Sequence, residues 1–183
     1  MPSIWATRPG ATSTSNTWHY AGLASSFPNM TPSSDNKTRI CRPLPDPWDE
    51  PKPEDSLPQI CKTFSKPDIN STTPNTTLDE LPVDKANQDS LLIFKYREKV
   101  YAMEHACPHQ AYPLTRATVS DIEDFGIVLS AGITCPKHGW TFDLTTGEAD
   151  TGRYKLGLYE VDLREGDGGE EVWVRKKERK RIG

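Results

Sequence analysis

Two short loops, each carrying one cysteine and one histidine, constrain this chain more than any other feature of its sequence. The first loop, EHACPHQAYPL, places Cys107 two residues before His109. The second, TCPKHGW, places Cys135 three residues before His138, and 25 residues separate His109 from Cys135. Buried cysteines and histidines seldom recur in twin loops through packing alone, so the pattern indicates that both loops serve one small metal centre.

Two thiolates and two imidazoles suit two kinds of metal centre. They complete either a tetrahedral zinc site or the ligand set of an iron–sulfur cluster. Zinc fingers carry their two histidines on one helix, and no helical pattern surrounds His109 or His138. We therefore favour a cluster and keep structural zinc as the alternative. His105 lies on a predicted strand, and we interpret it as a structural residue.

The remaining pattern is one of short strands and turns, which predicts an all-β fold. Strand-like segments occur at residues 17–24, 59–64, 91–96, 100–105, 140–144, 158–163 and 172–176. Proline and Asn/Asp/Ser/Thr clusters predict long loops at 29–58 and 66–82. Hairpins are expected around residues 97–99 and around the glycine-rich REGDGGEE. Only residues 116–129 allow a short helix.

Composition and charge limit the function classes. The chain has 183 residues, 34% of them hydrophobic, and no apolar run approaches the ~18 residues of a membrane span. The net charge of −4 hides an asymmetry, because residues 175–181 hold six bases and one acid and residues 1–174 carry −9. An acidic body argues against nucleic acid as a partner. We expect no membrane partner either.

The chain is expected to form one domain between two tails. We predict a flexible N-terminal tail at 1–17, a domain at 18–174 and a basic C-terminal tail at 175–183. The N-terminal segment lacks the apolar core of a secretory signal, so we expect a cytoplasmic protein, with mitochondrial or nuclear location as alternatives. Cys41 and Cys61 are isolated in the sequence, and we predict that both are reduced thiols.

The two loops resemble those of the Rieske iron–sulfur domains, which show Cys-x-His, a gap and then Cys-x-x-His. The segment HGWTFDLTTGE after the second loop is similar to the Rieske centres of ring-hydroxylating oxygenases. The resemblance implies a β-sandwich or barrel with a small cluster-binding subdomain within residues 105–145. It also implies one 2Fe-2S cluster, with Cys107 and Cys135 on the inner iron and His109 and His138 on the outer iron.

The chain departs from the Rieske proteins of cytochrome bc complexes in ways that predict a low reduction potential. Their extra disulfide cysteines correspond to Tyr112 and Lys137. Their serine and tyrosine, which donate hydrogen bonds to cluster sulfurs, correspond to Trp140 and Phe142. Without those donors the reduced, more negative cluster is less stable, and its potential is lower.

The resemblance implies a role in electron transfer. Ring-hydroxylating oxygenases also bind a mononuclear iron through two histidines and a carboxylate, but no histidine follows His138 here, so we expect no such active site. We expect an electron carrier between a reductase, such as a flavin reductase, and an oxygenase or other redox partner. The alternative is a redox-sensing, regulatory or structural metal module with no carrier role.

Overall fold

The computed structural model describes residues 17–44, 48, 50, 53, 59–67 and 76–177, and it confirms the all-β prediction. The only helical elements in this part of the chain are single 3-10 turns. They are η1 (Ala24–Ser26), η3 (Val83–Lys85) and η4 (Leu114–Arg116). Most of the predicted N-terminal tail, the end of the basic tail and parts of both long loops lie outside the described residues.

The strands of the described residues form two sheets. The larger has the order β5 (Thr76–Thr77), β1 (His19–Leu23), β13 (Gly169–Lys176), β12 (Leu158–Gly166), β8 (Lys99–Glu104), β7 (Ser90–Tyr96), β4 (Cys61–Ser65) and β6 (Glu80–Leu81), and β2 (Asn29–Met30) pairs with β7. The smaller has the order β11 (Thr141–Asp143), β10 (Ile127–Thr134), β9 (Thr118–Asp124) and β3 (Thr38–Arg39). Among the described pairs, only β1 with β5 and β2 with β7 run parallel.

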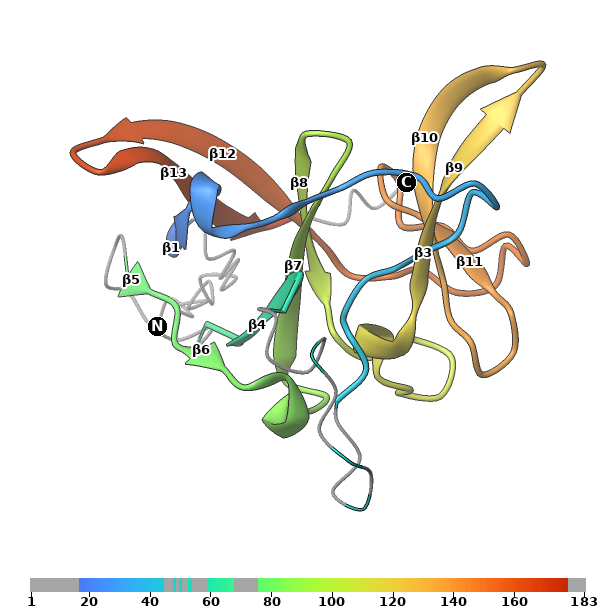
Figure 1. Ribbon diagram of the computed structural model, residues 1–183, viewed down its shortest axis with the longest axis horizontal. Coiled ribbons are helices and arrows are strands. Elements are labelled where there is room, and N and C mark those ends of the chain that lie inside the picture. Colours follow the sequence, from blue (N-terminus) through green and yellow to red (C-terminus); the bar gives the residue numbers. More distant parts are fainter. Residues whose placement is uncertain are drawn as a thin grey trace, which may run out of the picture.

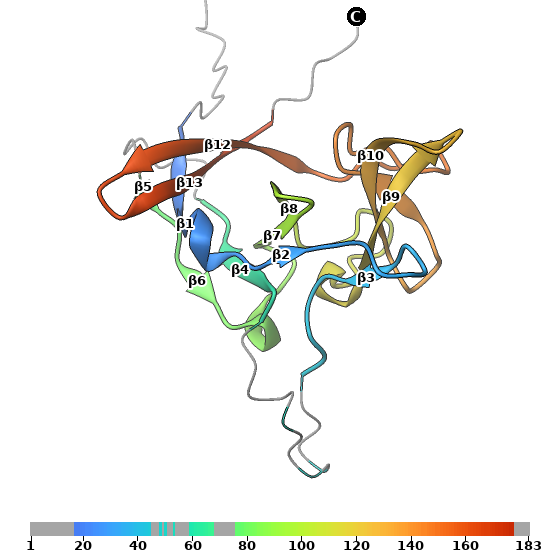
Figure 2. The ribbon, with the colours of Figure 1, turned by 45° about the horizontal axis from the view of Figure 1, so that its top comes forward.

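The central hairpin β7–β8 lies between the long hairpin β12–β13 and the smaller sheet (Figures 1 and 2). Its turn residues Arg97 and Glu98 have φ values of 48° and 62°, as a two-residue hairpin turn requires. Strand β7 is buried on both faces, which explains its continuous apolar run. Leu92 and Phe94 face the core shared with the smaller sheet, whereas Leu91 and Ile93 pack with strands of the larger sheet.

The prediction that residues 116–129 allow a short helix is wrong, because most of this segment belongs to the hairpin β9–β10. Val119 and Asp121 are buried, whereas the residue on either side of each is only partly buried. This alternation is the two-residue period of a strand. Phe125 and Gly126 form the turn, with φ values of 48° and 77°. The turn is poorly marked in the sequence, because a bulky aromatic rarely adopts a positive φ.

The prediction of two reduced thiols at Cys41 and Cys61 is also wrong. These two cysteines form a disulfide, with their Cα atoms 5.2 Å apart, inside the usual range for such a bridge. Cys41 follows β3 of the smaller sheet, and Cys61 begins β4 of the larger sheet. The disulfide therefore joins the two sheets across a separation of 20 residues. No local sequence pattern predicts this contact.

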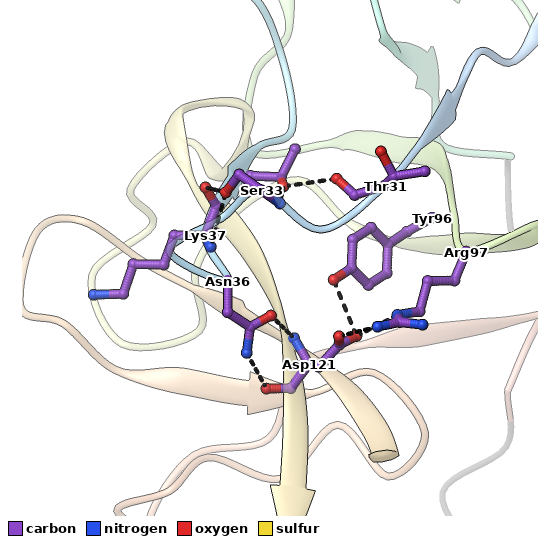
Figure 3. Close-up of polar contacts among 8 residues, drawn as sticks. Thr31, Ser33, Asn36, Lys37, Tyr96, Arg97 and Asp121 are labelled. Atoms are coloured by element: carbon purple, nitrogen blue, oxygen red, sulfur yellow. Dashed lines mark hydrogen bonds and ion pairs between the residues drawn. The ribbon is translucent and has the colours of Figure 1, made fainter. Parts of the chain in front are cut away.

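A polar cluster around Asp121 provides a second link between the sheets (Figure 3). The buried carboxylate of Asp121 on β9 accepts hydrogen bonds from the Tyr96 hydroxyl, at 3.0 Å, and from the Arg97 guanidinium. The backbone of Asp121 pairs with the side-chain amide of Asn36, which lies in the segment that connects β2 to β3. Three separate parts of the chain thus meet at one aspartate.

No helix in the described part of the chain is long and apolar enough to cross a membrane.

Candidate metal centre

The first Cys–His loop leaves the end of β8 and closes on itself. Ala106 and Pro113 form an isolated bridge across its base. The Cys107 N–H donates to the Tyr112 carbonyl at 2.9 Å, and the Ala111 N–H donates to the Cys107 carbonyl at 2.7 Å. Ala111 adopts a φ of 53° to make this turn. These bonds turn the Cys107 thiol into the protein and leave the tip of the loop at the surface.

The second loop, between β10 and β11, repeats the same geometry. The Cys135 N–H donates to the Trp140 carbonyl and the Gly139 N–H donates to the Cys135 carbonyl, both at 2.9 Å. As in the first loop, the donors and acceptors lie four and five residues after the cysteine. Gly139, at the place equivalent to Ala111, has a φ of 73°. The two loops are therefore related as a local structural repeat.

The structure pairs the predicted side chains across the two loops, cysteine with cysteine and histidine with histidine. Cys107 and Cys135 are only 4% and 2% exposed, and their thiols are neighbours. Burial, and then the neighbouring thiol, raises the pKa of Cys135. The rings of His109 and His138 lie further out, with their centroids 4.7 Å apart. The site has an inner pair of sulfurs and an outer pair of imidazoles.

This donor set fits a two-iron cluster. Among the residues that the structure describes, no three His, Cys, Asp or Glu side chains converge on the position of a single ion. A [2Fe–2S] centre of mixed ligation needs no such trio, because each iron takes two protein ligands. The separation into one thiol pair and one imidazole pair matches that requirement.

Aromatic side chains enclose His109 on the outer side of the centre. The Trp140 ring stacks on His109, with centroids 3.9 Å apart and an interplanar angle of 21°. The Tyr154 ring meets the His109 ring edge-on, with their centroids 5.3 Å apart. The centroids of the Tyr154 and Trp140 rings are 5.1 Å apart. Burial, the charge of His138 and that of Lys137 lower the pKa of His109.

Tyr154 is the residue of this site that sequence reasoning missed. It belongs to the loop that follows β11, and no motif marks it. Its contact with His109 depends on how residues 149–154 fold back, where the Ala149 N–H donates to the Tyr154 carbonyl at 3.1 Å. A tyrosine 16 positions after His138 carries no local signal of such a contact.

The other histidines in the described chain lie outside the centre. His105 is 2% exposed, its Nδ1 lies 2.9 Å from the Asn87 carbonyl, and its Nε2 lies 3.2 Å from the Thr115 hydroxyl. Burial lowers the pKa of His105, in keeping with a neutral, hydrogen-bonded structural residue. His19 is on β1, in the larger sheet.

The family model described as Rieske [2Fe-2S] domain matches residues 73–158, a range that includes both loops. No curated protein matches the chain.

Solved structures show a distant likeness. One is a chain of the complex of reduced oxygenase and oxidized ferredoxin in carbazole 1,9a-dioxygenase, with 19% identity, coverage of 88% of this chain and 97% of that chain, and a TM-score of 0.43. The ferredoxin of carbazole 1,9a-dioxygenase from Nocardioides aromaticivorans IC177 has 24% identity, coverage of 48% and 76%, and a TM-score of 0.35. The putative NADH-dependent nitrite reductase small subunit from Mycobacterium tuberculosis has 18% identity, coverage of 54% and 80%, and a TM-score of 0.38.

Proposed function

We propose that residues 73–158, which the Rieske [2Fe-2S] family model matches, form a Rieske domain, and that the protein transfers single electrons between a reductase and an oxygenase or another redox partner. One [2Fe–2S] cluster comes with the domain and supplies the one-electron chemistry. The protein residues hold the cluster, shield it and determine which side of it a partner can reach.

We assign the ligands as the sequence predicts. Cys107 and Cys135 would hold the inner iron, and His109 and His138 would hold the outer iron. The depth of the side chains supports this assignment, since both thiols are buried and the His138 ring is exposed. Apolar core residues surround the thiols, and this packing excludes water from the inner side.

The observation that carries the proposal is the position of the imidazole pair at the outer tip of the two loops. An electron carrier must bring its redox centre close to the surface of each partner. Here the histidine side of the site lies at the surface. The backbone of each cysteine is held by two hydrogen bonds within its own loop. Histidine ligands also keep a second ring nitrogen that can meet solvent or a partner group.

A redox sensor is the second candidate function. The disulfide between Cys41 and Cys61 favours it, because these two cysteines belong to the same apolar core as Cys107 and Cys135. A carrier should pass repeatedly between its two oxidation states without losing its cluster. A sensor should instead lose or remodel the cluster when its oxidation state changes.

Absorption and EPR spectra of anaerobically purified protein test the proposal. We expect a reddish-brown protein with two irons and two acid-labile sulfides per chain. Cys107→Ser and Cys135→Ser should each abolish assembly of the cluster, whereas Cys41→Ser should keep the full spectrum. A colourless protein with one bound zinc would contradict the proposal, and a coloured Cys107→Ser protein would contradict the ligand assignment.

Repeated cycles separate the two candidate functions. The protein is reduced with a flavin reductase and then reoxidised in air-free buffer by a mild chemical oxidant. Full recovery of the oxidised spectrum over many cycles supports the carrier. Progressive loss of iron during the first cycles would favour the sensor.

A further inference from the structure

The two outer histidines have different surroundings. His109 is half-buried, with Trp140 stacked on one face and Tyr154 against its edge. These two aromatic rings cover part of the His109 ring. Trp140 is itself packed against the apolar core, so the stack is anchored.

His138 lies on the open side of the centre. It is exposed, as are Pro136, Lys137 and Gly139 around it. Its ring contact within the described chain is with His109 alone. Because the two imidazoles are neighbours and only one is covered, a partner has one open route to the histidine side of the site.

Lys137 places a positive charge beside that route. Its ammonium group lies 5.9 Å from the centre of the Tyr112 ring, and the described residues provide it with no ion pair. Lys137 is thus a positive site on a body whose residues 1–174 carry a net charge of −9. At short range this cation favours an approaching surface that presents carboxylates at that point, while the net negative charge of the body opposes acidic surfaces elsewhere.

We propose that the redox partner docks over His138, on the side of Lys137, and presents acidic groups there, while Trp140 and Tyr154 close the route over His109. This proposal rests on the electron-transfer function proposed above. Tyr154 then acts as a positioning residue that decides which imidazole is reached, and Lys137 selects the charge of the partner.

Chemical labelling of the cluster-loaded protein tests the covered side. Diethyl pyrocarbonate modifies accessible imidazole nitrogens, and mass spectrometry identifies each modified histidine. We expect His138 to be modified before His109 in the wild type, and Tyr154→Ala to make His109 reactive without changing His138. Tyr112→Ala is the matched control, because Tyr112 lies beside Lys137 rather than on the His109 ring. Equal reactivity of His109 and His138 in the wild type would overturn the proposal.

Small redox reagents of opposite charge test the role of Lys137. The reduced protein is mixed with anionic ferricyanide or with a cationic cobalt(III) phenanthroline complex, and the oxidation rates are measured by stopped flow. Lys137→Glu should slow the anionic reagent by about tenfold at low salt and accelerate the cationic one, with both effects reduced at high salt.

Lys99→Glu is the control for net charge. Lys99 also lies over a tyrosine ring, with its ammonium group 5.2 Å from Tyr101, but it is at the hairpin end of β8, the opposite end from the first loop. The proposal predicts that Lys99→Glu changes the two oxidation rates only slightly. A change in these rates equal to that caused by Lys137→Glu would overturn the proposal. A colourless protein overturns the proposed function and this proposal together, whereas a coloured protein with equal histidine labelling overturns this proposal alone.

Discussion

Ala111 and Gly139 occupy equivalent backbone positions in the two Cys–His loops, and both adopt a positive φ. A side chain makes this conformation costly, whereas glycine adopts it freely. The first loop therefore contains local strain that the second lacks. The two backbone hydrogen bonds of the first loop hold Ala111 in place despite this cost.

Ala111→Gly should raise the free energy of unfolding by about 0.5–1 kcal/mol, because it removes the strain of a positive φ. Denaturant unfolding followed by circular dichroism measures the change. Gly139→Ala is the reverse experiment and should lower the free energy of unfolding by about 1 kcal/mol. A Cβ at position 139 would meet no atom within 4 Å, so its cost is conformational alone. Destabilisation by Ala111→Gly would contradict this account.

Phe142 is fully buried on β11 and offers no hydroxyl to the centre. We expect a reduction potential near the lower Rieske limit, about −150 mV, in the wild-type protein. Phe142→Tyr adds one hydrogen-bond donor at the position that corresponds to the tyrosine of the Rieske proteins of cytochrome bc complexes, and it should raise the potential measured by voltammetry. Phe142→Leu, which adds no donor, serves as the control. A wild-type potential above about +100 mV would contradict the argument.

At this scale the sequence contained enough information to identify the four clustered side chains but not Tyr154. Cys107 and His109 lie in one tight turn, and Cys135 and His138 lie in another, so local spacing predicts each pair. The contact between Tyr154 and His109 is made across 45 residues, and no periodicity or motif encodes a contact of that kind.

The hairpin β9–β10 shows why one element was predicted wrongly. A hairpin is most easily recognised when its turn is Asn-Gly or Asp-Gly, and here the turn is Phe125-Gly126, with Phe125 98% exposed. Exposed apolar residues near the turn also obscure the alternation of apolar and polar residues along the two strands. The pairing of β9 with β3, which places Thr38 opposite Val119, also supports the strand, and that pairing is non-local.

Asp121 connects β9 to the turn of the β7–β8 hairpin, and this contact should hold the smaller sheet in position. Asp121→Ala should lower the free energy of unfolding by about 2–3 kcal/mol, because it leaves the buried Tyr96 hydroxyl without its acceptor and removes the partner of Arg97. Asp162→Ala removes the partner of Arg164 from a partly solvent-exposed ion pair and should change stability by at most about 1 kcal/mol. Equal effects of the two substitutions in denaturant unfolding would contradict the assigned role.

The same contact should make stability depend on pH in the alkaline range. Burial, and then the hydrogen bond and charge of Asp121, raise the pKa of Tyr96 from 10.0 to about 12. Above pH 10 the unfolded chain releases this proton and the folded chain retains it, so the stabilisation present below pH 10 is lost as pH rises towards 12. Tyr96→Phe should flatten this decline in thermal unfolding measured between those pH values. An unchanged decline would assign it to other groups.

On the scale of the whole molecule, a polar cluster and a disulfide link the two sheets at different places, in addition to the apolar core that the sheets share. The Asp121 cluster joins β9 to the β7–β8 turn, and the disulfide joins the end of β3 to the start of β4. The sequence predicts that β-strands dominate, because strand periodicity is local. Which strands form each sheet, and which cysteines pair, depend on contacts between distant segments, so they could not be read from the same pattern.

The disulfide should stabilise the fold without taking part in binding the cluster. Closing a loop with a separation of 20 residues limits the unfolded chain and is expected to contribute about 3 kcal/mol. Dithiothreitol should therefore lower the denaturant midpoint of the wild type, and Cys41→Ser should show the lower midpoint with or without the reductant. Cys61→Ser should behave in the same way, because each substitution breaks the same bridge.

The visible spectrum separates this structural role from a role at the metal centre. Cys41 and Cys61 are bonded to each other, whereas Cys107 and Cys135 are free thiols. We therefore expect the cluster spectrum to survive both serine substitutions while stability falls. Loss of colour in Cys41→Ser would make this cysteine a ligand. A wild-type midpoint unaffected by dithiothreitol would mean that the two thiols are reduced in solution, as their isolated positions in the sequence first predicted. Stability and colour together therefore decide whether the link between the sheets is covalent and whether the centre depends on it.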